Sequence, residues 1–159
     1  MSAIIHIEKL SKRFPVGNGE FTALNQISLE FHKGEFTGFV GPSGSGKTTL
    51  LNIIGSLDTP TEGEVTVLGQ SIAHLTPRQS AQLRNRHLGF IFQTYNLFPV
   101  YTVFENVEFA LLLQHMPAAE RRKAVLDALD WVGLTDKIQS RPAQLTGGES
   151  QRVAIARAM

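Results

Sequence analysis

A glycine-rich octapeptide with a lysine near its end is the strongest sign of chemistry in this sequence. Residues 41–48 read GPSGSGKT and match the pattern G-x-x-x-x-G-K-S/T at every position. Small side chains let backbone N–H groups approach a polyphosphate closely. Lys47 would bring a positive charge to the β- and γ-phosphates, and the Thr48 hydroxyl would be a ligand for Mg²⁺. The pattern therefore predicts a nucleoside triphosphate site. Its residues are Gly41, Pro42, Ser43, Gly44, Ser45, Gly46, Lys47, Thr48 and Thr49.

A second glycine cluster lies near the end of the sequence, where residues 145–152 read LTGGESQR. Thr146 is a good helix N-cap, and Glu149 follows three residues later, so the segment predicts a capping box at the start of a helix. Gly147 and Gly148 would leave the first N–H groups of that helix accessible to an anion. The alternative is a capped helix with no further function.

The elements that would position these clusters follow from the apolar pattern. Strands are predicted over residues 3–10, 21–31, 35–40, 64–68 and 88–92, and helices over residues 47–57, 77–85 and 118–132. Strands dominate the first 92 residues and helices the remainder. The pattern predicts an α/β fold in a single domain, with a subdomain boundary near Gln93.

The composition excludes several classes of protein. The 159 residues carry a net charge of +1, which argues against a primary nucleic-acid binder. Hydrophobic residues make up 42% and charged residues 18%, which is typical of a globular protein. The longest apolar run covers only residues 109–113, and the start, MSAIIHIEKL, lacks the features of a signal peptide. The absence of cysteine excludes disulfides and thiolate metal sites and fits a cytoplasmic location.

The order of these motifs resembles that of the ATP-binding cassette (ABC) family. The second glycine cluster, about 100 residues after the phosphate loop, is similar to the family signature LSGGQ, and Gln93 follows a predicted strand at the place of the family's Q-loop. The segments NIIGSLDTPTEGEV, GFIFQTYNLFP and RVAIARAM resemble the branch that serves lipoprotein-release and macrolide-efflux exporters. The resemblance implies a P-loop NTPase with a mixed sheet core and antiparallel N-terminal strands in residues 1–92, and a helical subdomain in residues 93–159.

The resemblance also implies roles for individual residues. ATP would bind between two copies, with Lys47 and the phosphate loop of one copy facing the signature of the other. Gln93 would contact Mg²⁺ and the attacking water. Phe14 would stack on adenine, where the family prefers tyrosine, or would be a core residue of an edge strand. The signature residues that would contact the partner's ATP are Thr146, Gly147, Gly148 and Glu149.

The implied partners are a second nucleotide-binding domain and a transmembrane permease. Residues 96–107 would lie near the surface that receives the permease, or would be ordinary subdomain packing. The subunit would be peripheral on the inner face of the plasma (inner) membrane and would act in transport, with no nucleic acid as partner.

The signature departs from the family pattern at two positions. Thr146 replaces serine and keeps the hydroxyl, whereas Glu149 replaces glutamine and adds a negative charge. If Glu149 folds back onto Thr146 as the capping box predicts, its charge lies at a helix N-terminus, where it is favourable.

Two further family features are not found in the sequence. No aspartate is followed by glutamate, so the Walker B acid and the catalytic glutamate are missing, and all five histidines precede the signature, so the later sensor histidine is missing too. We expect a cassette cut just before its second nucleotide motif and inactive alone. The alternatives are a non-catalytic nucleotide-binding remnant and a soluble, non-transport ABC ATPase.

Overall fold

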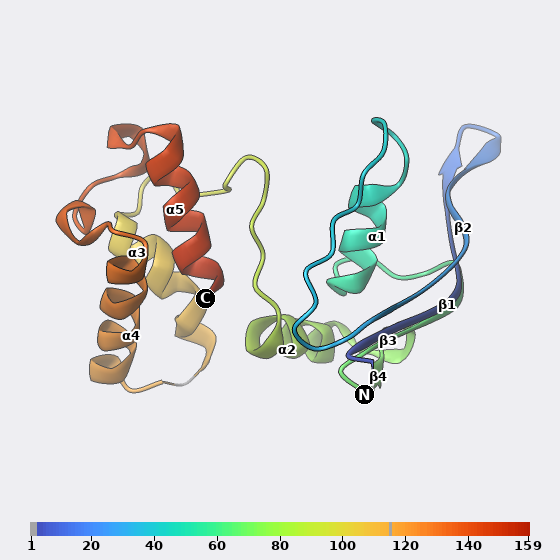
Figure 1. Cartoon of the computed structure of the whole chain (residues 1–159), viewed down its shortest axis with the longest axis horizontal. Helices are drawn as coiled ribbons and strands as arrows, with labels where there is room; N and C mark the ends of the chain where they lie inside the picture. The colour runs from blue at the N-terminus through green and yellow to red at the C-terminus, as the bar shows by residue number, and fades with distance from the viewer. Residues whose placement is uncertain (1–2, 115) are drawn as a thin grey trace. The chain divides into compact units, whose positions relative to one another are not determined.

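The structure is a computed structural model that describes residues 3–114 and 116–159, so that His115, one of the five histidines, lies outside the described residues. The chain forms two compact units, one ending at Arg84 and the other running from Asn85 to Met159 (Figure 1). The predicted boundary near Gln93 lies inside the second unit.

An antiparallel sheet of four strands forms the base of the first unit. Its spatial order is β2-β1-β3-β4, and its members are β1 (Ile5–Val16), β2 (Gly19–Phe31), β3 (Glu62–Val67) and β4 (Gln70–Ser71). Ile7 and Val65 are directly paired across β1 and β3, and both are almost wholly buried on the same face of the sheet. Leu10, three residues after Ile7, is also buried, because the pairing of β1 with β2 shifts its register between these two residues. The predicted strands over residues 3–10, 21–31 and 64–68 are confirmed, and β1 continues through Pro15 to a hairpin turn.

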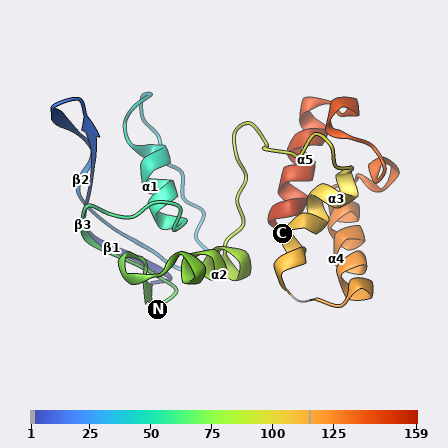
Figure 2. The same ribbon diagram turned by 180° about the vertical axis from the view of Figure 1, so that it is seen from behind.

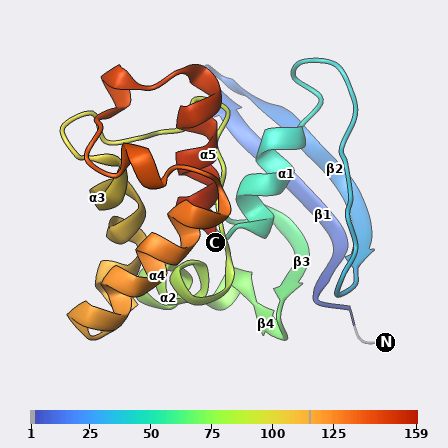
Figure 3. The ribbon, with the colours of Figure 1, turned by 60° about the vertical axis from the view of Figure 1, so that its left-hand side comes forward.

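Helix α1 (Lys47–Ile54) contacts β2 and lies beside the sheet (Figures 1 and 3). It buries Leu50 and Ile53 and ends at Ile54, three residues before the predicted end, with Gly55 as its C-cap. A short 3₁₀ turn (Ile72–His74) leads to α2 (Pro77–His87), which Figure 2 shows from behind. Thr76 caps the start of α2, since its Oγ1 accepts from Gln79 N at 3.3 Å and its backbone N donates to Gln79 Oε1 at 2.8 Å.

The strands predicted over residues 35–40 and 88–92 are wrong. Both segments are non-helical chain without strand pairing. Within the described residues no other strand offers either segment a ladder of backbone hydrogen bonds, and a strand exists only as a member of such a ladder. Phe36 and Val40 are consequently fully exposed. The sheet is therefore antiparallel, and the part of the chain that the structure describes does not form the parallel part of the expected mixed sheet.

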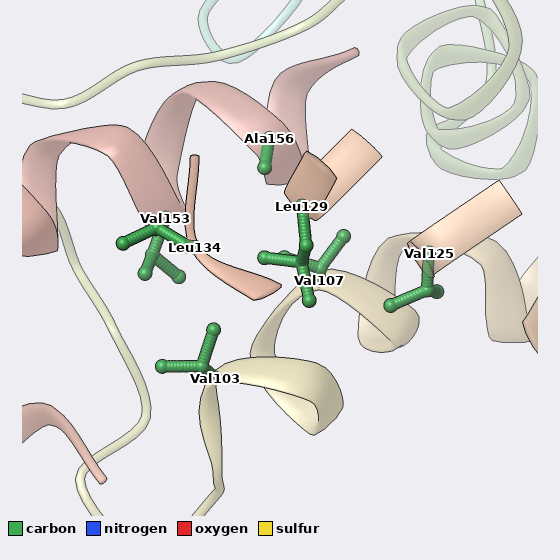
Figure 4. Close-up of a cluster of buried hydrophobic side chains, with 7 residues drawn as sticks. All are labelled: Val103, Val107, Val125, Leu129, Leu134, Val153 and Ala156. Atoms are coloured by element: carbon green, nitrogen blue, oxygen red, sulfur yellow. The ribbon is translucent and has the colours of Figure 1, made fainter. Parts of the chain in front are cut away.

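The second unit is helical. Its elements are α3 (Val103–Glu108), α4 (Ala118–Trp131), α5 (Gly147–Ala158) and the 3₁₀ turns Phe109–Gln114, Thr135–Lys137 and Pro142–Gln144. Aliphatic side chains from α3, α4, α5 and the turn after α4 meet in one cluster (Figure 4), formed by Val103, Val107, Val125, Leu129, Leu134, Val153 and Ala156. The predicted amphipathic helix over residues 118–132 is confirmed, because Val125 and Leu129 are buried on its inner face. Over residues 3–114 and 116–159, no helix has both the length and the hydropathy of a membrane span.

Candidate nucleotide-binding site

The phosphate loop contains a tight turn and ends at the first residue of α1. Ser45 N donates to the carbonyl oxygen of Pro42 at 3.3 Å, which closes a turn around Gly44. Gly44 and Gly46 have φ angles of +80° and +86°, in the left-handed region that favours glycine. A Cβ at Gly46 would also lie 2.6 Å from the carbonyl oxygen of Ala23 on β2. Gly46 is therefore required both by its backbone conformation and by the close packing of the loop on the sheet.

The N-terminus of α1 points its backbone donors at this loop. The N-cap, Gly46, has no side chain to bond them, and the first turn contains no acidic residue. The first of the helical bonds joins Leu50 N to the Gly46 carbonyl at 2.9 Å, so the N–H groups ahead of Leu50 have no partner further back in the helix. Together with the positive end of the helix dipole, this arrangement suits a bound anion.

Lys47 places its charge inside the loop. Its ammonium group Nζ donates to the carbonyl oxygens of Gly41 at 2.8 Å and Pro42 at 2.7 Å, and to Ser45 Oγ at 3.1 Å. All three donors of the ammonium thus lie against the loop that would surround a phosphate. Because phosphate oxygens are charged acceptors and carbonyls are neutral ones, a phosphate in the loop would compete well for these donors.

Phe14 lies near the tip of the β1–β2 hairpin and is only half-buried. It pairs with Phe21 across the two strands, and Lys12 Nζ lies 5.0 Å from the centroid of its ring. The hairpin tip and the phosphate loop project toward the same end of the first unit (Figures 1 and 2). The partial exposure of Phe14 leaves aromatic surface on which a base can stack, which a wholly buried core position would not.

The start of α5 has the predicted capping box. Thr146 Oγ1 accepts from Glu149 N at 3.2 Å, and Glu149 Oε2 accepts from Thr146 N at 2.7 Å and from Thr146 Oγ1 at 3.0 Å. These bonds, led by the one from the backbone N–H of Thr146, hold the pKa of Glu149 below its ordinary value. Lys137 Nζ lies 3.7 Å from the same carboxylate. The extra negative charge of this signature is therefore folded back onto the cap, while Gly147 and Gly148 are exposed.

Gln93 occupies the second position of a turn that Tyr95 N closes by donating to the Phe92 carbonyl at 3.0 Å. Its side chain is exposed. Thr48, the other predicted Mg²⁺ ligand, belongs to the first unit and Gln93 to the second. Both side chains offer the neutral oxygen ligands that Mg²⁺ accepts.

An aromatic group marks the segment predicted to face the permease. The ring centroids of Phe98 and Phe109 lie 4.7 Å apart, and those of Phe98 and Tyr101 lie 5.4 Å apart. Each of the three rings is 37–41% exposed. The backbone that carries them is fixed by the fully buried Asn106, whose Nδ2 donates to the carbonyl of Phe98 at 3.2 Å and whose Oδ1 accepts from Phe98 N at 2.7 Å.

Comparison with known proteins covers almost the whole chain. Residues 24–159 match the family model described as ABC transporter. The chain is 44% identical over 159 residues to an uncharacterized ABC transporter ATP-binding protein of Thermotoga maritima and 43% identical over 157 residues to the lipoprotein-releasing system ATP-binding protein LolD of Pseudomonas fluorescens. It spans 68% and 69% of the length of these two relatives. It is 45% identical to the macrolide export ATP-binding/permease protein MacB of Brucella melitensis, of which it spans 24%.

Solved structures agree with the sequence relatives. The dimeric, post-hydrolysis ATP-binding cassette MJ0796, bound to ADP and Pi, superposes with a TM-score of 0.90 at 41% identity. The match covers 98% of this chain and 68% of that one. The predicted fold, a P-loop cassette of the ABC type with antiparallel N-terminal strands and a helical subdomain, is thereby confirmed. On the family match and on these relatives together, the chain belongs to the ABC transporter family and is one of its ATP-binding cassettes.

Proposed function

We propose that this chain supplies the phosphate loop and the signature of the ATP-binding subunit of an ABC exporter, which couples ATP binding and hydrolysis to transport. The observation that carries the proposal is the loop at residues 41–48, in which the Lys47 ammonium and the uncapped N-terminus of α1 converge on the space that a phosphate would fill. In P-loop proteins, the β- and γ-phosphates are usually bound by N–H donors at a helix N-terminus together with the charge of a lysine.

The proposed role of each residue follows from its chemistry. The backbone N–H groups of residues 44–49 would bind the phosphates, and Thr48 and Gln93 would be the protein ligands of Mg²⁺, which neutralises phosphate charge when it is bound. Gln93 would also orient the attacking water. Thr146, Gly147 and Gly148 would cap the γ-phosphate held by a second copy, because the carboxylate of Glu149 is turned onto the cap and does not repel it.

The direction of transport and the partners are inferred from the relatives and the surface. LolD belongs by name to a lipoprotein-releasing system, and MacB is a macrolide export ATP-binding/permease protein. MJ0796 is dimeric, which supports a head-to-tail homodimer here. The half-exposed rings of Phe98, Tyr101 and Phe109 would contact the permease. The subunit would then lie on the cytoplasmic face of the inner membrane.

Replacing Phe14 tests the nucleotide site against a site for phosphate alone. The experiment uses an extended cassette, which consists of residues 1–159 followed by the C-terminal third of a related cassette. In this protein, Phe14→Ala should weaken ATP binding by about 1–3 kcal/mol, because base stacking is lost. Tripolyphosphate, which has no base, should bind unchanged, and Phe14→Tyr should be nearly neutral. Displacement of a fluorescent ATP analogue measures all three affinities. Phe21→Ala, at the cross-strand partner of Phe14, is the matched control. Equal weakening of both ligands by Phe14→Ala would mean that Phe14 is structural.

Replacing the two left-handed glycines of the loop separates backbone strain from steric fit. Gly44→Ala should cost about 1–2 kcal/mol of unfolding free energy, the price of a side chain at positive φ. Gly46→Ala should cost about 1–3 kcal/mol more, because its Cβ would meet Ala23 O at 2.6 Å while that of Gly44 meets nothing within 4 Å. Urea unfolding of the extended cassette measures both. Equal losses would contradict the close packing of the loop on β2.

A further inference from the structure

The turn that carries Gln93 continues into an unusual backbone. Tyr95 and Asn96 have φ angles of 60° and 48°, and Asn96 N donates to the Thr94 carbonyl at 2.7 Å in a second, tighter turn. Two consecutive left-handed residues that are not glycine are disfavoured, above all where one of them is as bulky as tyrosine. Something must hold this double turn in place.

Arg157, in the last turn of α5, bonds to both strained residues. Its Nη1 donates to the carbonyl oxygen of Asn96 and its Nη2 to that of Tyr95, each at 2.7 Å. The side chain is partly buried, and burial lowers the pKa of its guanidinium. A planar guanidinium can hold two adjacent carbonyls at once, which a point charge on a flexible stem does less well.

The same segment touches α5 at two further places. The backbone at Gly89 approaches the C-terminal end of α5 so closely that a Cβ there would overlap the carbonyl oxygen of Ala158. At the other end of α5, the hydroxyl of Tyr95 lies 3.9 Å from the position that a Cβ on Gly147 would take. The chain on both sides of Gln93 therefore packs against α5, the helix that begins with the signature residues.

We propose that Arg157 is a positioning residue that locks the Gln93 turn to α5, so that Gln93 and the signature are set in place together. The inference rests on the proposed function, in which both groups act on ATP. Helix α5 is one rigid element of 12 residues. Because Arg157 in its last turn bonds to the Gln93 turn, that turn should move together with the signature at the other end of the helix. The pattern of the sequence does not single out Arg157 or Tyr95, because no motif marks a left-handed tyrosine.

The test compares Arg157 with another arginine of the same unit. In the extended cassette, Arg157→Met should lower kcat for ATP about tenfold or more while KM for ATP stays within about twofold, because the phosphate loop is intact. Arg157→Lys, which keeps charge and most of the stem and should fold, should show a smaller loss of the same kind. Arg121→Met is the control: Arg121 also bonds to a carbonyl, that of Met116, and to Glu108, and neither bond involves the Gln93 turn.

A structural role and a positioning role give different results. The variants are compared at an equal loss of melting temperature. If Arg157→Met and Arg157→Lys then lower kcat no more than Arg121→Met does, the proposal is wrong. The backbone amide NMR signals of Gln93 and Thr94 in the nucleotide-free protein provide a second readout. They should shift or broaden in both Arg157 variants and stay in place in Arg121→Met. This readout remains decisive if the wild-type protein does not hydrolyse ATP, an outcome that would count against the proposed function alone.

Discussion

A polypeptide of residues 1–159 should release no phosphate from Mg²⁺–ATP above background, whereas the extended cassette should turn over. None of the aspartates in the 159 residues is followed by glutamate, so we expect this polypeptide to lack the pair that would position the Mg²⁺-bound water and act as general base. General-base assistance alone is worth about 10²–10⁴ in rate. Phosphate release measured for both proteins at equal concentration tests this expectation.

The same comparison should show a large difference in folding. Residues 35–40 and 88–92 find no strand partner within the described residues, and Phe36 and Val40 are fully exposed. Unpaired apolar segments of this kind promote aggregation, and net stability is only about 5–15 kcal/mol in ordinary domains. The polypeptide should therefore be poorly soluble, while the extended cassette melts cooperatively. A cooperative melt together with turnover by the 159 residues alone would overturn this expectation and require a catalytic acid elsewhere in the sequence.

Replacing Lys47 with alanine should remove most of the affinity of the extended cassette for ATP. The ammonium group lies within the loop, and a phosphate bound there would lose a charge-assisted partner worth about 1.5–3 kcal/mol, or roughly a 10- to 150-fold weaker Kd. Displacement of a fluorescent ATP analogue measures the change.

Lys33→Ala provides the control for Lys47→Ala, since it removes the same charge from an exposed turn of the same unit. The Lys33 variant should bind ATP almost as the wild type does. Thermal melting of both variants should stay close to that of the wild type, because the bonds of the Lys47 side chain within residues 3–114 and 116–159 all go to loop atoms. If the Lys47 variant bound ATP normally, the phosphate loop would be wrongly assigned.

Local signals predicted the elements that the chain stabilises by itself. The capping box predicted at Thr146 depends on residues three positions apart, and it forms; Thr76 and Gln79 have the same arrangement at the start of α2. Strands β1 and β2 are joined by a short hairpin at Gly17, and β3 pairs with β1 on its other side. Each of these strands therefore has a pairing partner within the first unit. The buried face of α4 was predictable from the helical spacing of its apolar residues, because this spacing is also a local signal.

The elements that sequence reasoning missed depend on distant partners. Residues 35–40 and 88–92 have strand-like composition, but a β-propensity measures how well a residue fits beside neighbouring strands and not an intrinsic conformation. The apolar Phe36 and Val40 show this most clearly, since both are exposed in the absence of such a neighbour.

The phosphate loop was predictable because its residues are contiguous. Its glycines have the left-handed φ angles and the close approach to β2 that such a loop requires. The contact between Arg157 and the carbonyls of Tyr95 and Asn96 was not predictable, because it joins residues about 60 positions apart through main-chain atoms, which carry no sequence signal. The sequence therefore predicts groups that would contact ATP, but it does not predict the residues that hold those groups in place.

The most direct test of nucleotide binding at the phosphate loop is an NMR titration of the isotopically labelled extended cassette with Mg²⁺–ATP. The backbone amide signals of Gly44, Gly46, Lys47 and Thr48 should shift in a saturable way, because their N–H groups would bind the phosphates. Tripolyphosphate should shift the same signals, and adenosine should leave them unchanged. Saturable binding of ATP that leaves these four amides unmoved would contradict the account, since the nucleotide would then bind elsewhere.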